Sequence, residues 1–470
     1  MTHRRWTLAV VCAATAMLML DIAVVNTALS RIAEDLNAGL GGLQWVVDAY
    51  TLALAATVLT FGSLADRFGR RRLFTAGLAL FTLASAACAA SGTIEALVAA
   101  RAVQGIGAAV MFAVSLAILA DAFPGAKERA GALAAYGATI GASFAVGPLV
   151  GGALTSGLDW QWIFLVNIPL GIACVWITRT YVRESRDPNA RRVDVPGQVA
   201  LGGGLFLLVL GLLRANEEGW TSAPIIAALG GAVALLVAFI VIERRVAEPM
   251  LPLGLFRNPS FAGAQIAALA ISATFFAIFL YVTIYLQQVL GLSAIEAGLV
   301  YVPATIVMFL VSGATAALGE KVSARAMVAG GLALVAVGLG LFTLAGEDSS
   351  WWTLMPGFML AAFGTGLFNP SVTAVALGSA PIEQSGLAAG VNDTFRQAGI
   401  AIGVAGLGAL VPAEAAFGGS PAEYVSGLHD AAYVGGAVAL VGAIAAAMLI
   451  RGTRTAERTA PSGRLAPQPA

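Results

Sequence analysis

Charged residues are scarce in this sequence. Asp, Glu, Lys and Arg make up 11% of its 470 residues, whereas a soluble globular domain contains about 25%. Acidic and basic residues balance to a net charge of zero, so bulk electrostatics offers no basic surface to a nucleic-acid backbone. The composition argues against a soluble protein and against a nucleic-acid partner.

Histidine and cysteine are also rare. His3 and His429 lie outside the apolar segments, and the three cysteines are scattered within them. Isolated thiols in apolar segments pack as small hydrophobic side chains more often than they form disulfides or bind metal. The two lysines follow Ala126 and Glu320, so no glycine-rich phosphate-binding loop ends in lysine. We therefore expect no metal site, no cofactor, no enzymatic activity and no direct use of ATP.

Long apolar segments, in contrast, fill most of the chain. Apolar residues make up 59% of the sequence, and the mean hydropathy is +0.86. A helix that crosses a bilayer needs about 20 mostly apolar residues. Such segments lie at roughly 6–29, 43–64, 73–91, 97–120, 130–154, 163–182, 196–213, 224–242, 261–285, 296–318, 326–345, 353–378, 386–411 and 430–450. We expect an all-α membrane protein with fourteen transmembrane helices in the lipid bilayer.

The N-terminus resembles a signal peptide, because basic residues precede an apolar segment. It has no recognisable cleavage site, so we expect this segment to remain as the first helix. All but four of the 26 Lys and Arg residues fall on the side of the two termini or in the tail. Arg31 and Arg214 face the other side, and Arg101 and Arg396 lie inside apolar segments. The positive-inside rule then places both termini in the cytoplasm and the protein in the cell membrane.

Two polar connections divide the apolar segments into blocks. The first follows the sixth segment and the second follows the eighth. The tail is rich in Pro, Ala, Thr and Arg, a composition typical of disorder. The expected domains are an N-terminal six-helix bundle (1–182), a cytoplasmic linker (183–195), two additional helices (196–242), a second cytoplasmic connection (243–260), a C-terminal six-helix bundle (261–451) and a disordered cytoplasmic tail (452–470).

The densest group of charges is the stretch GSLADRFGRRRL, residues 62–73, between the second and third segments. So many charges do not lie in hydrocarbon, which predicts a tight loop at the membrane surface. Asp66 can accept hydrogen bonds from a neighbouring Arg or from the free N–H groups of a helix start. We expect it to hold the second helix against the start of the thirteenth, near Gly386. The expected residues of this cytoplasmic gate are Gly62, Asp66, Arg67, Gly69 and Arg70.

This stretch has a counterpart in the second half of the chain. Residues 64–77 align without gaps on residues 318–331, with Leu, one Arg and the final Gly identical. Asp66 and Arg67 become Glu320 and Lys321. A repeat spaced by about half the chain indicates two related halves, an arrangement common among transporters.

Two carboxylates and one arginine interrupt the apolar segments of the first block. Asp21, in the first helix with Asn26 nearby, is either a structural hydrogen-bonding group or a proton or cation site, because charge there costs several kcal/mol unless it is paired, hydrated or protonated. Asp48, near the outer end of the second helix, either reaches water or titrates. Arg101, in the fourth helix, needs a partner, which Asp21 or Asp48 could supply.

The fifth segment carries a stripe of small residues and one proline. Small residues at four-residue spacing allow helices to approach closely, and a proline bends a helix. On physical grounds alone, generic tight packing explains this stripe as well as a functional role does. The residues are Gly137, Gly141, Gly147, Pro148, Gly151 and Gly152.

The second block adds a polar stripe and an aromatic cluster. Asp393, Arg396 and Gln397 share one face of the thirteenth helix, either as a local ion pair or as a site that faces a cavity and serves a cationic substrate or gating. Three phenylalanines of the ninth helix could form an aromatic wall for a ligand, although packing against lipid is the commoner arrangement. They are Phe275, Phe276 and Phe279.

Several of these motifs resemble those of the major facilitator superfamily. GSLADRFGRRRL is similar to the loop between its second and third helices, and the segment around Arg101 to its fourth-helix motif, whose Arg is linked to proton transfer. The fifth-helix pattern GxxxGxxxxxGPxxGG resembles the antiporter motif of drug exporters. The string WQWIFLVNIPLG, residues 160–171, resembles a mark of the fourteen-helix drug:proton antiporter family.

The resemblance implies a fold of two six-helix bundles plus two extra helices. It also implies a proton-coupled antiporter that exports hydrophobic, cationic drugs or antibiotics by alternating access. The proton-coupling residues would be Asp21, Asp48 and Arg101, and those for substrate or gating Asp393, Arg396, Gln397 and Asn26. Partners would be a small-molecule substrate and protons, and a monomer is expected. The rival interpretation is an importer or exporter of one metabolite on the same fold, although the fifth-helix stripe argues against import.

Overall fold

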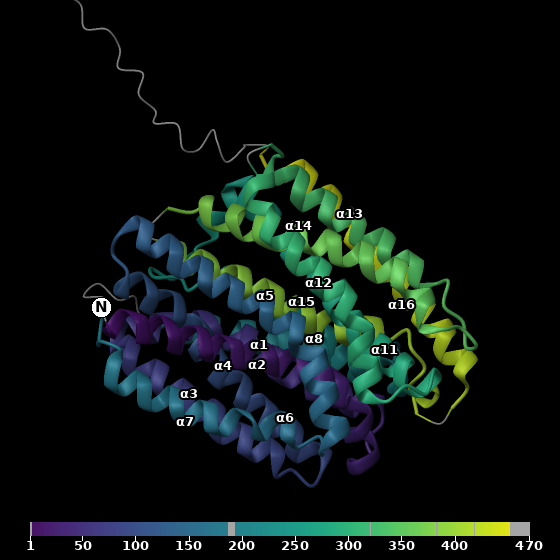
Figure 1. Ribbon diagram of the computed structural model, residues 1–470. Coiled ribbons are helices and arrows are strands. Elements are labelled where there is room, and N and C mark those ends of the chain that lie inside the picture. Colours follow the sequence, from purple (N-terminus) through teal and green to yellow (C-terminus); the bar gives the residue numbers. More distant parts are fainter. Residues whose placement is uncertain (1, 187–192, 320, 382–383, 418, 452–470) are drawn as a thin grey trace, which may run out of the picture.

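The computed structural model describes residues 2–186, 193–319, 321–381, 384–417 and 419–451. These residues form helices and connections without a strand, which confirms the all-α prediction. The helices of the first half lie on one side of the molecule in Figure 1 and those of the second half on the other. Residues 187–192 of the expected linker, Glu320 of the repeat and the expected tail lie outside the described residues.

The first half contains the six expected helical spans. The sixth is divided at Val166, three residues before Pro169, whose nitrogen carries no hydrogen for a helical bond. α2 packs along α4, α3 along α4, and α1 along α5. The elements are α1 (Thr2–Leu36), α2 (Leu40–Phe68), α3 (Arg70–Ala89), α4 (Ile94–Ala122), α5 (Ala126–Gly157), α6 (Trp162–Leu165) and α7 (Asn167–Tyr181).

The second half repeats this arrangement. Its first span consists of α10 (Pro259–Ile271) and α11 (Ala277–Ile284), each followed by a π-helical turn. These turns are η2 (Ser272–Phe276) after α10 and η3 (Tyr285–Val289) after α11. Such turns inside long helices often occur at functional sites. The remaining spans are α12 (Ala294–Leu318), α13 (Ala324–Phe342), α14 (Met355–Gly378), α15 (Ser385–Gly408) and α16 (Pro421–Leu449). Short turns are η1 (Leu253–Arg257), η4 (Trp351–Leu354) and η6 (Ala413–Ala415).

Both copies of the charged sequence repeat occupy equivalent places. Residues 64–77 cover the end of α2 and the start of α3, and residues 318–331 cover the end of α12 and the start of α13. Each copy therefore connects the second and third spans of its half, as expected of two related halves.

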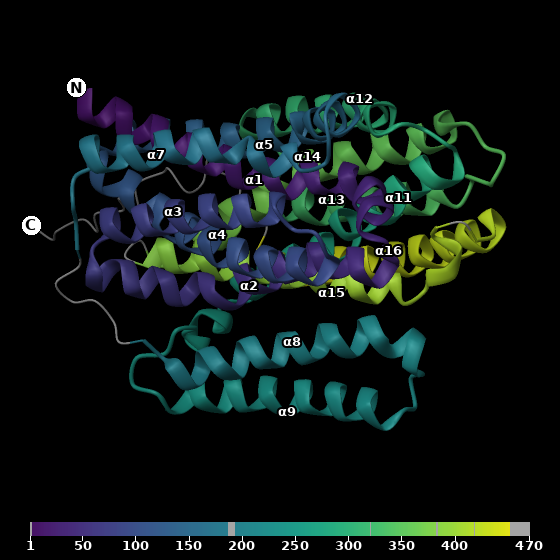
Figure 2. The same cartoon turned by 90° about the horizontal axis from the view of Figure 1, so that it is seen from below.

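Two further helices, α8 (Val195–Glu218) and α9 (Ala223–Arg245), stand beside the main body in Figure 2. α8 contacts both α2 and α15. Gln198 fixes it to α2: its Nε2 donates to the carbonyl of Ala56 at 2.7 Å, and its Oε1 accepts from Thr60. α9 is the least buried of the candidate spans, so most of its surface is left to face lipid.

Among the described residues, twelve helices are long and apolar enough to cross a membrane, and bent α5 raises the number to 13. α15 has the length of a span but is kept out of this set by its polar residues, among them Asp393, Arg396 and Gln397. With α15 the described helices provide the two six-span halves and the extra pair. The predicted all-α fold class is confirmed, and the predicted count of fourteen spans is reached only when bent α5 and polar α15 are included.

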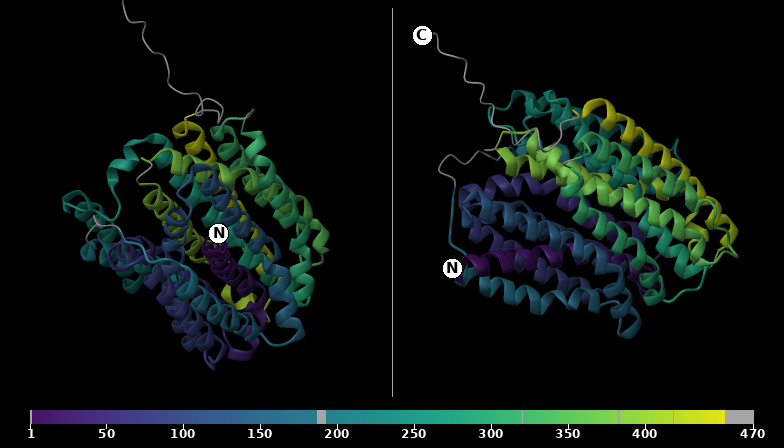
Figure 3. Two further views of the ribbon diagram at one scale, coloured as in Figure 1. Left: turned by 60° about the vertical axis from the view of Figure 1, so that its left-hand side comes forward. Right: turned by 45° about the horizontal axis from the view of Figure 1, so that its top comes forward.

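The two halves are joined by hydrogen bonds near one end of the molecule. We call the end at which the N-terminus lies the terminal end, and the opposite end the far end (Figure 3). Two hydrogen bonds join the halves toward the far end. Gln44 Nε2 donates to Tyr281 Oη at 2.8 Å, and Gln287 Nε2 donates to the carbonyl of Thr27 at 3.0 Å. These contacts hold the halves together at the far end.

Candidate functional site

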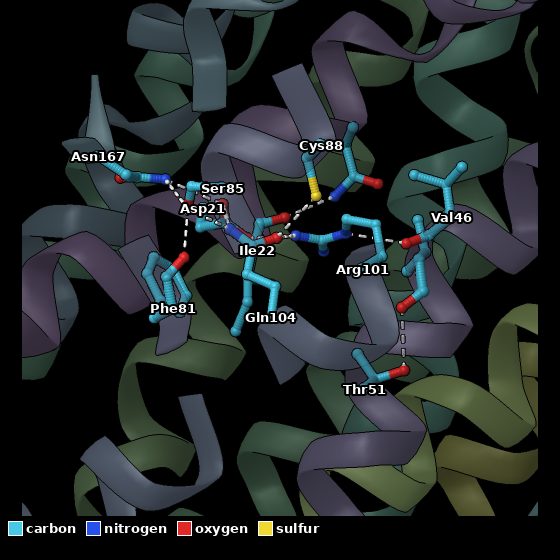
Figure 4. Close-up of polar contacts among 12 residues, drawn as sticks. Asp21, Ile22, Val46, Thr51, Phe81, Ser85, Cys88, Arg101, Gln104 and Asn167 are labelled. Atoms are coloured by element: carbon cyan, nitrogen blue, oxygen red, sulfur yellow. Dashed lines mark hydrogen bonds and ion pairs between the residues drawn. The ribbon is translucent and has the colours of Figure 1, made fainter. Parts of the chain in front are cut away.

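A buried hydrogen-bond network joins four helices of the first half. Asp21 on α1 accepts from two residues of α4: its Oδ2 lies 2.5 Å from Arg101 Nη1, and its Oδ1 lies 2.8 Å from Gln104 Nε2. Asn167, at the start of α7, donates to the same Oδ1 at 3.2 Å. Gln104 Nε2 also lies 2.9 Å from Ser85 Oγ on α3. Figure 4 shows these side chains converging between the helices.

Arg101 makes contacts through its Nε and Nη1 atoms and with an aromatic ring. Besides Asp21 it contacts Gln104 Oε1 at 2.6 Å, its Nε donates to the carbonyl of Val46 at 3.1 Å, and its charge lies 4.2 Å from the ring centre of Tyr50. The side chains of Arg101 and Asp21 are 2% and 0% exposed. A buried ion pair is tolerated only when its remaining hydrogen-bonding groups are satisfied, as they are here. Of the two carboxylates that could pair with Arg101, Asp21 is the one that does so in the structure.

Asp48 is the other carboxyl of this region, and its surroundings are different. It is 0% exposed, so the alternative in which it reaches water is wrong. Neither oxygen has a hydrogen-bond partner among the described residues. A buried carboxylate without a donor or a cation is costly, and the neutral acid is the form that this environment accommodates. Its neighbour Val47 lines a cavity between the halves.

This cavity encloses about 60 Å³ in this conformation, and about 780 Å³ when the open space around it is counted. Residues from both halves line it, and all are uncharged. Asn26 and Thr305 are the polar ones among them. An apolar pocket with a few polar groups is typical of sites for small hydrophobic molecules.

The phenylalanine cluster belongs to this cavity. Phe275, Phe276 and Phe279 all line it, and Phe275 is only 4% exposed. Phe279 stacks on Tyr301 with ring centres 4.7 Å apart. The favoured alternative of packing against lipid is therefore wrong, because all three rings line the cavity between the halves.

The stripe on α15 does not form the local ion pair that was one of its two interpretations. Arg396 Nη1 donates to Asn369 Oδ1 on α14 at 3.2 Å. Asp393 is 6% exposed, and its Oδ2 has no partner among the described residues. No ion pair joins the two side chains within this described helix. Gln397 is also buried.

Comparison with known proteins identifies the family. The family model of the Major Facilitator Superfamily matches residues 11–404 and 317–470. The chain belongs to the major facilitator superfamily. It is a multi-span membrane transporter of small molecules rather than an enzyme.

Relatives of this transporter carry the names of resistance and export proteins. Multidrug resistance protein Stp of Mycobacterium tuberculosis is 36% identical over 400 residues, covering 84% of this chain and 74% of that protein. Cephamycin export protein CmcT of Amycolatopsis lactamdurans is 36% identical over 437 residues, covering 92% and 89%. Puromycin resistance protein pur8 of Streptomyces alboniger is 36% identical over 435 residues, covering 90% and 86%.

Solved structures agree on the fold. A crystal structure of the peptide transporter POT with sulfate has a TM-score of 0.67 at 16% identity, covering 95% of this chain and 96% of that one. The human organic anion transporter MFSD10 has a TM-score of 0.65 at 15% identity, covering 94% and 99%.

The charged loop of this facilitator is tied to its own half. Gly69 has φ of +111°, a conformation that side chains rarely adopt. Arg70 pairs with Asp66 at 2.8 Å, and the backbone N–H of Arg71 donates to Glu184 at 3.0 Å. In this conformation Asp66 is thus paired within the loop, and the expected contact with the start of α15 is not among its hydrogen bonds in the described residues.

The stripe on α5 separates into two groups. A methyl group at Gly147 or Gly151 would overlap α1, and one at Gly152 would lie 2.8 Å from the Cα of Ile295 on α12. Gly137 has open space, and Gly141 faces only Phe309 at 3.8 Å. Gly147 and Gly151 thus allow α5 to approach α1 within the first half, and Gly152 allows α5 to approach α12 of the second half.

We expect Gly147→Leu to reduce transport strongly while the protein still inserts, because overpacking costs about 1–3 kcal/mol and separates α5 from α1. Gly141→Leu is the matched control, with the same change at an open position. Dye efflux from cells is compared at equal membrane expression. Equal activities of the two variants would show that the approach of α5 to α1 does not limit transport.

Sequence reasoning missed part of the network. Asn167 was not expected to contact Asp21, and Ser85 was not expected to accept hydrogen bonds from Gln104 and Asn167, although both are polar residues in or beside apolar segments. Polarity in such a position was the available signal, and their distance from Asp21 in sequence concealed the contact.

Proposed function

We propose that this facilitator is a proton-coupled antiporter that exports hydrophobic drugs or antibiotics across the cell membrane, with its terminal end in the cytoplasm. The observation that carries the proposal is Asp48, a buried carboxyl without a hydrogen-bond partner in the described part of the chain, one residue from the wall of an apolar cavity between the halves. Such a group can load and release a proton as the cavity changes access.

The surrounding network supports this division of roles. Arg101 holds Asp21 as a paired carboxylate, so a second carboxyl is left to exchange the proton. The contacts at the far end keep the halves together there, and opening them while the terminal end closes would transfer the cavity to the other side of the membrane. The distribution of Lys and Arg supports a cytoplasmic terminal end.

The relatives support export of drugs. Their names include multidrug resistance, cephamycin export and puromycin resistance. A dedicated exporter of one metabolite is the alternative, because some of these relatives are named for a single compound.

The proposal is tested in proteoliposomes with radiolabelled puromycin. We expect an acidic interior to drive accumulation of the label, because protons leave as substrate enters, and a protonophore to abolish it. Accumulation driven by an acidic exterior would indicate proton symport, and import as its direction. Accumulation independent of pH would refute proton coupling, and exchange of only one compound among several would favour the dedicated exporter.

A further inference from the structure

The cavity lacks a charged lining residue, but one charge lies directly behind its wall. Arg396 lies one turn from Ile400, a lining residue on the same helix, toward the terminal end. Its guanidinium lies 5.7 Å from the ring centre of Phe276, which also lines the cavity. A positive charge is thus separated from the cavity by one aromatic ring.

This guanidinium has unused hydrogen-bonding capacity. An arginine carries five N–H donors, and in the described residues the hydrogen bond of the Arg396 guanidinium is the one to Asn369 Oδ1 at 3.2 Å. Arg396 is partly exposed, whereas Asp393 on the preceding turn is buried. Among the described residues Asp393 attracts the guanidinium electrostatically, but no hydrogen bond or ion pair joins the two side chains, so N–H donors remain for another partner.

Arg101 shows what a structural arginine looks like in this protein. It is 2% exposed and bonded to a carboxylate, an amide and a backbone carbonyl. Among the described residues, Arg396 has one hydrogen-bond partner, an amide oxygen, together with a ring face and the nearby carboxyl of Asp393, with which it forms no ion pair. An arginine beside a cavity whose N–H donors are only partly used can bind an oxyanion through charge-assisted hydrogen bonds.

We propose that Arg396 and Asn369 form a subsite for the carboxylate or sulfonate group of an amphiphilic substrate whose apolar body lies against Phe276. The inference rests on the proposed function, because it takes the cavity as the substrate site. It assigns an anionic substrate where the sequence led us to expect a cationic one. Arg396 lies on the terminal-end side of the cavity, where a substrate entering from the cytoplasm meets it first.

The test uses two fluorescent dyes that differ by one group. Anilinonaphthalene sulfonate carries the anion, and phenylnaphthylamine has the same ring skeleton without it. Dissociation constants are measured for the full chain in lipid nanodiscs, with empty nanodiscs as background. In Arg396→Gln, we expect the ratio of the sulfonate constant to the neutral constant to rise about tenfold or more, the effect of losing a charge-assisted hydrogen bond.

A second variant guards against a folding defect. Asn369→Asp keeps the size of the side chain and places a carboxylate against Arg396, so it should raise the same ratio, while Arg396→Lys should raise it less. An unchanged ratio in Arg396→Gln and Asn369→Asp, or equal losses for both dyes, would overturn the subsite. Since binding is measured without a pH gradient, failure of proton coupling would leave the result unaffected.

Discussion

Asp48→Asn is expected to abolish proton-driven accumulation of substrate while the protein remains folded. The amide has nearly the size of the acid but cannot release a proton. Because neither oxygen of Asp48 has a partner among the described residues, the substitution breaks no hydrogen bond there. The measurement is puromycin accumulation in proteoliposomes under a pH gradient, next to exchange of labelled for unlabelled substrate without a gradient.

The two assays separate coupling from substrate movement. Asp48→Asn should retain exchange and reduce gradient-driven accumulation to the level of empty liposomes. Asp48→Glu is the matched control, since it keeps a titratable carboxyl and should retain part of the coupling. If Asp48→Asn accumulates substrate as well as the parent protein, another group carries the proton.

Arg101→Met is expected to give the largest loss of stability. It removes the cation from Asp21 and leaves a carboxylate buried with only amide donors. Breaking a buried ion pair from one side costs about 3–5 kcal/mol. Thermal unfolding of the purified protein in detergent should therefore begin at a markedly lower temperature.

Two comparisons make this result specific. The double variant Asp21→Asn with Arg101→Met removes both charges and should recover much of the lost stability, although not transport. Arg31→Met breaks an ion pair with Glu34 whose side chains are 56% and 55% exposed, and should cost about 0–1 kcal/mol. A double variant less stable than Arg101→Met would mean that the network is stabilised by shape rather than by charge pairing.

The sequence and the structure contribute differently to the candidate site. Asp21, Asp48, Arg101 and Arg396 were conspicuous in sequence, because each interrupts an apolar segment. The sequence left open which carboxylate pairs with Arg101, and the structure shows that Asp21 does. The sequence favoured packing of the three phenylalanines against lipid, whereas the structure places them in the cavity wall.

The same division holds for the small residues of α5. Their four-residue spacing identified a helix face suited to close packing, but all members of the stripe looked alike. Only the structure separates Gly147, which meets α1, from Gly137, which meets nothing within 4 Å. A proline in the stripe, Pro148, lines the cavity.

The sequence by itself therefore determined that the chain is a membrane protein of many helices in two related halves, and which polar residues lie within them. Hydropathy and helix length are properties of about 20 consecutive residues, so they can be read locally. Partners and cavity walls depend on how each helix is rotated and tilted, and this is set by packing against several other helices at once. Only the tertiary structure could decide that Asp21 is paired, that Asp48 has no hydrogen-bond partner among the described residues, and that Arg396 lies behind the cavity wall.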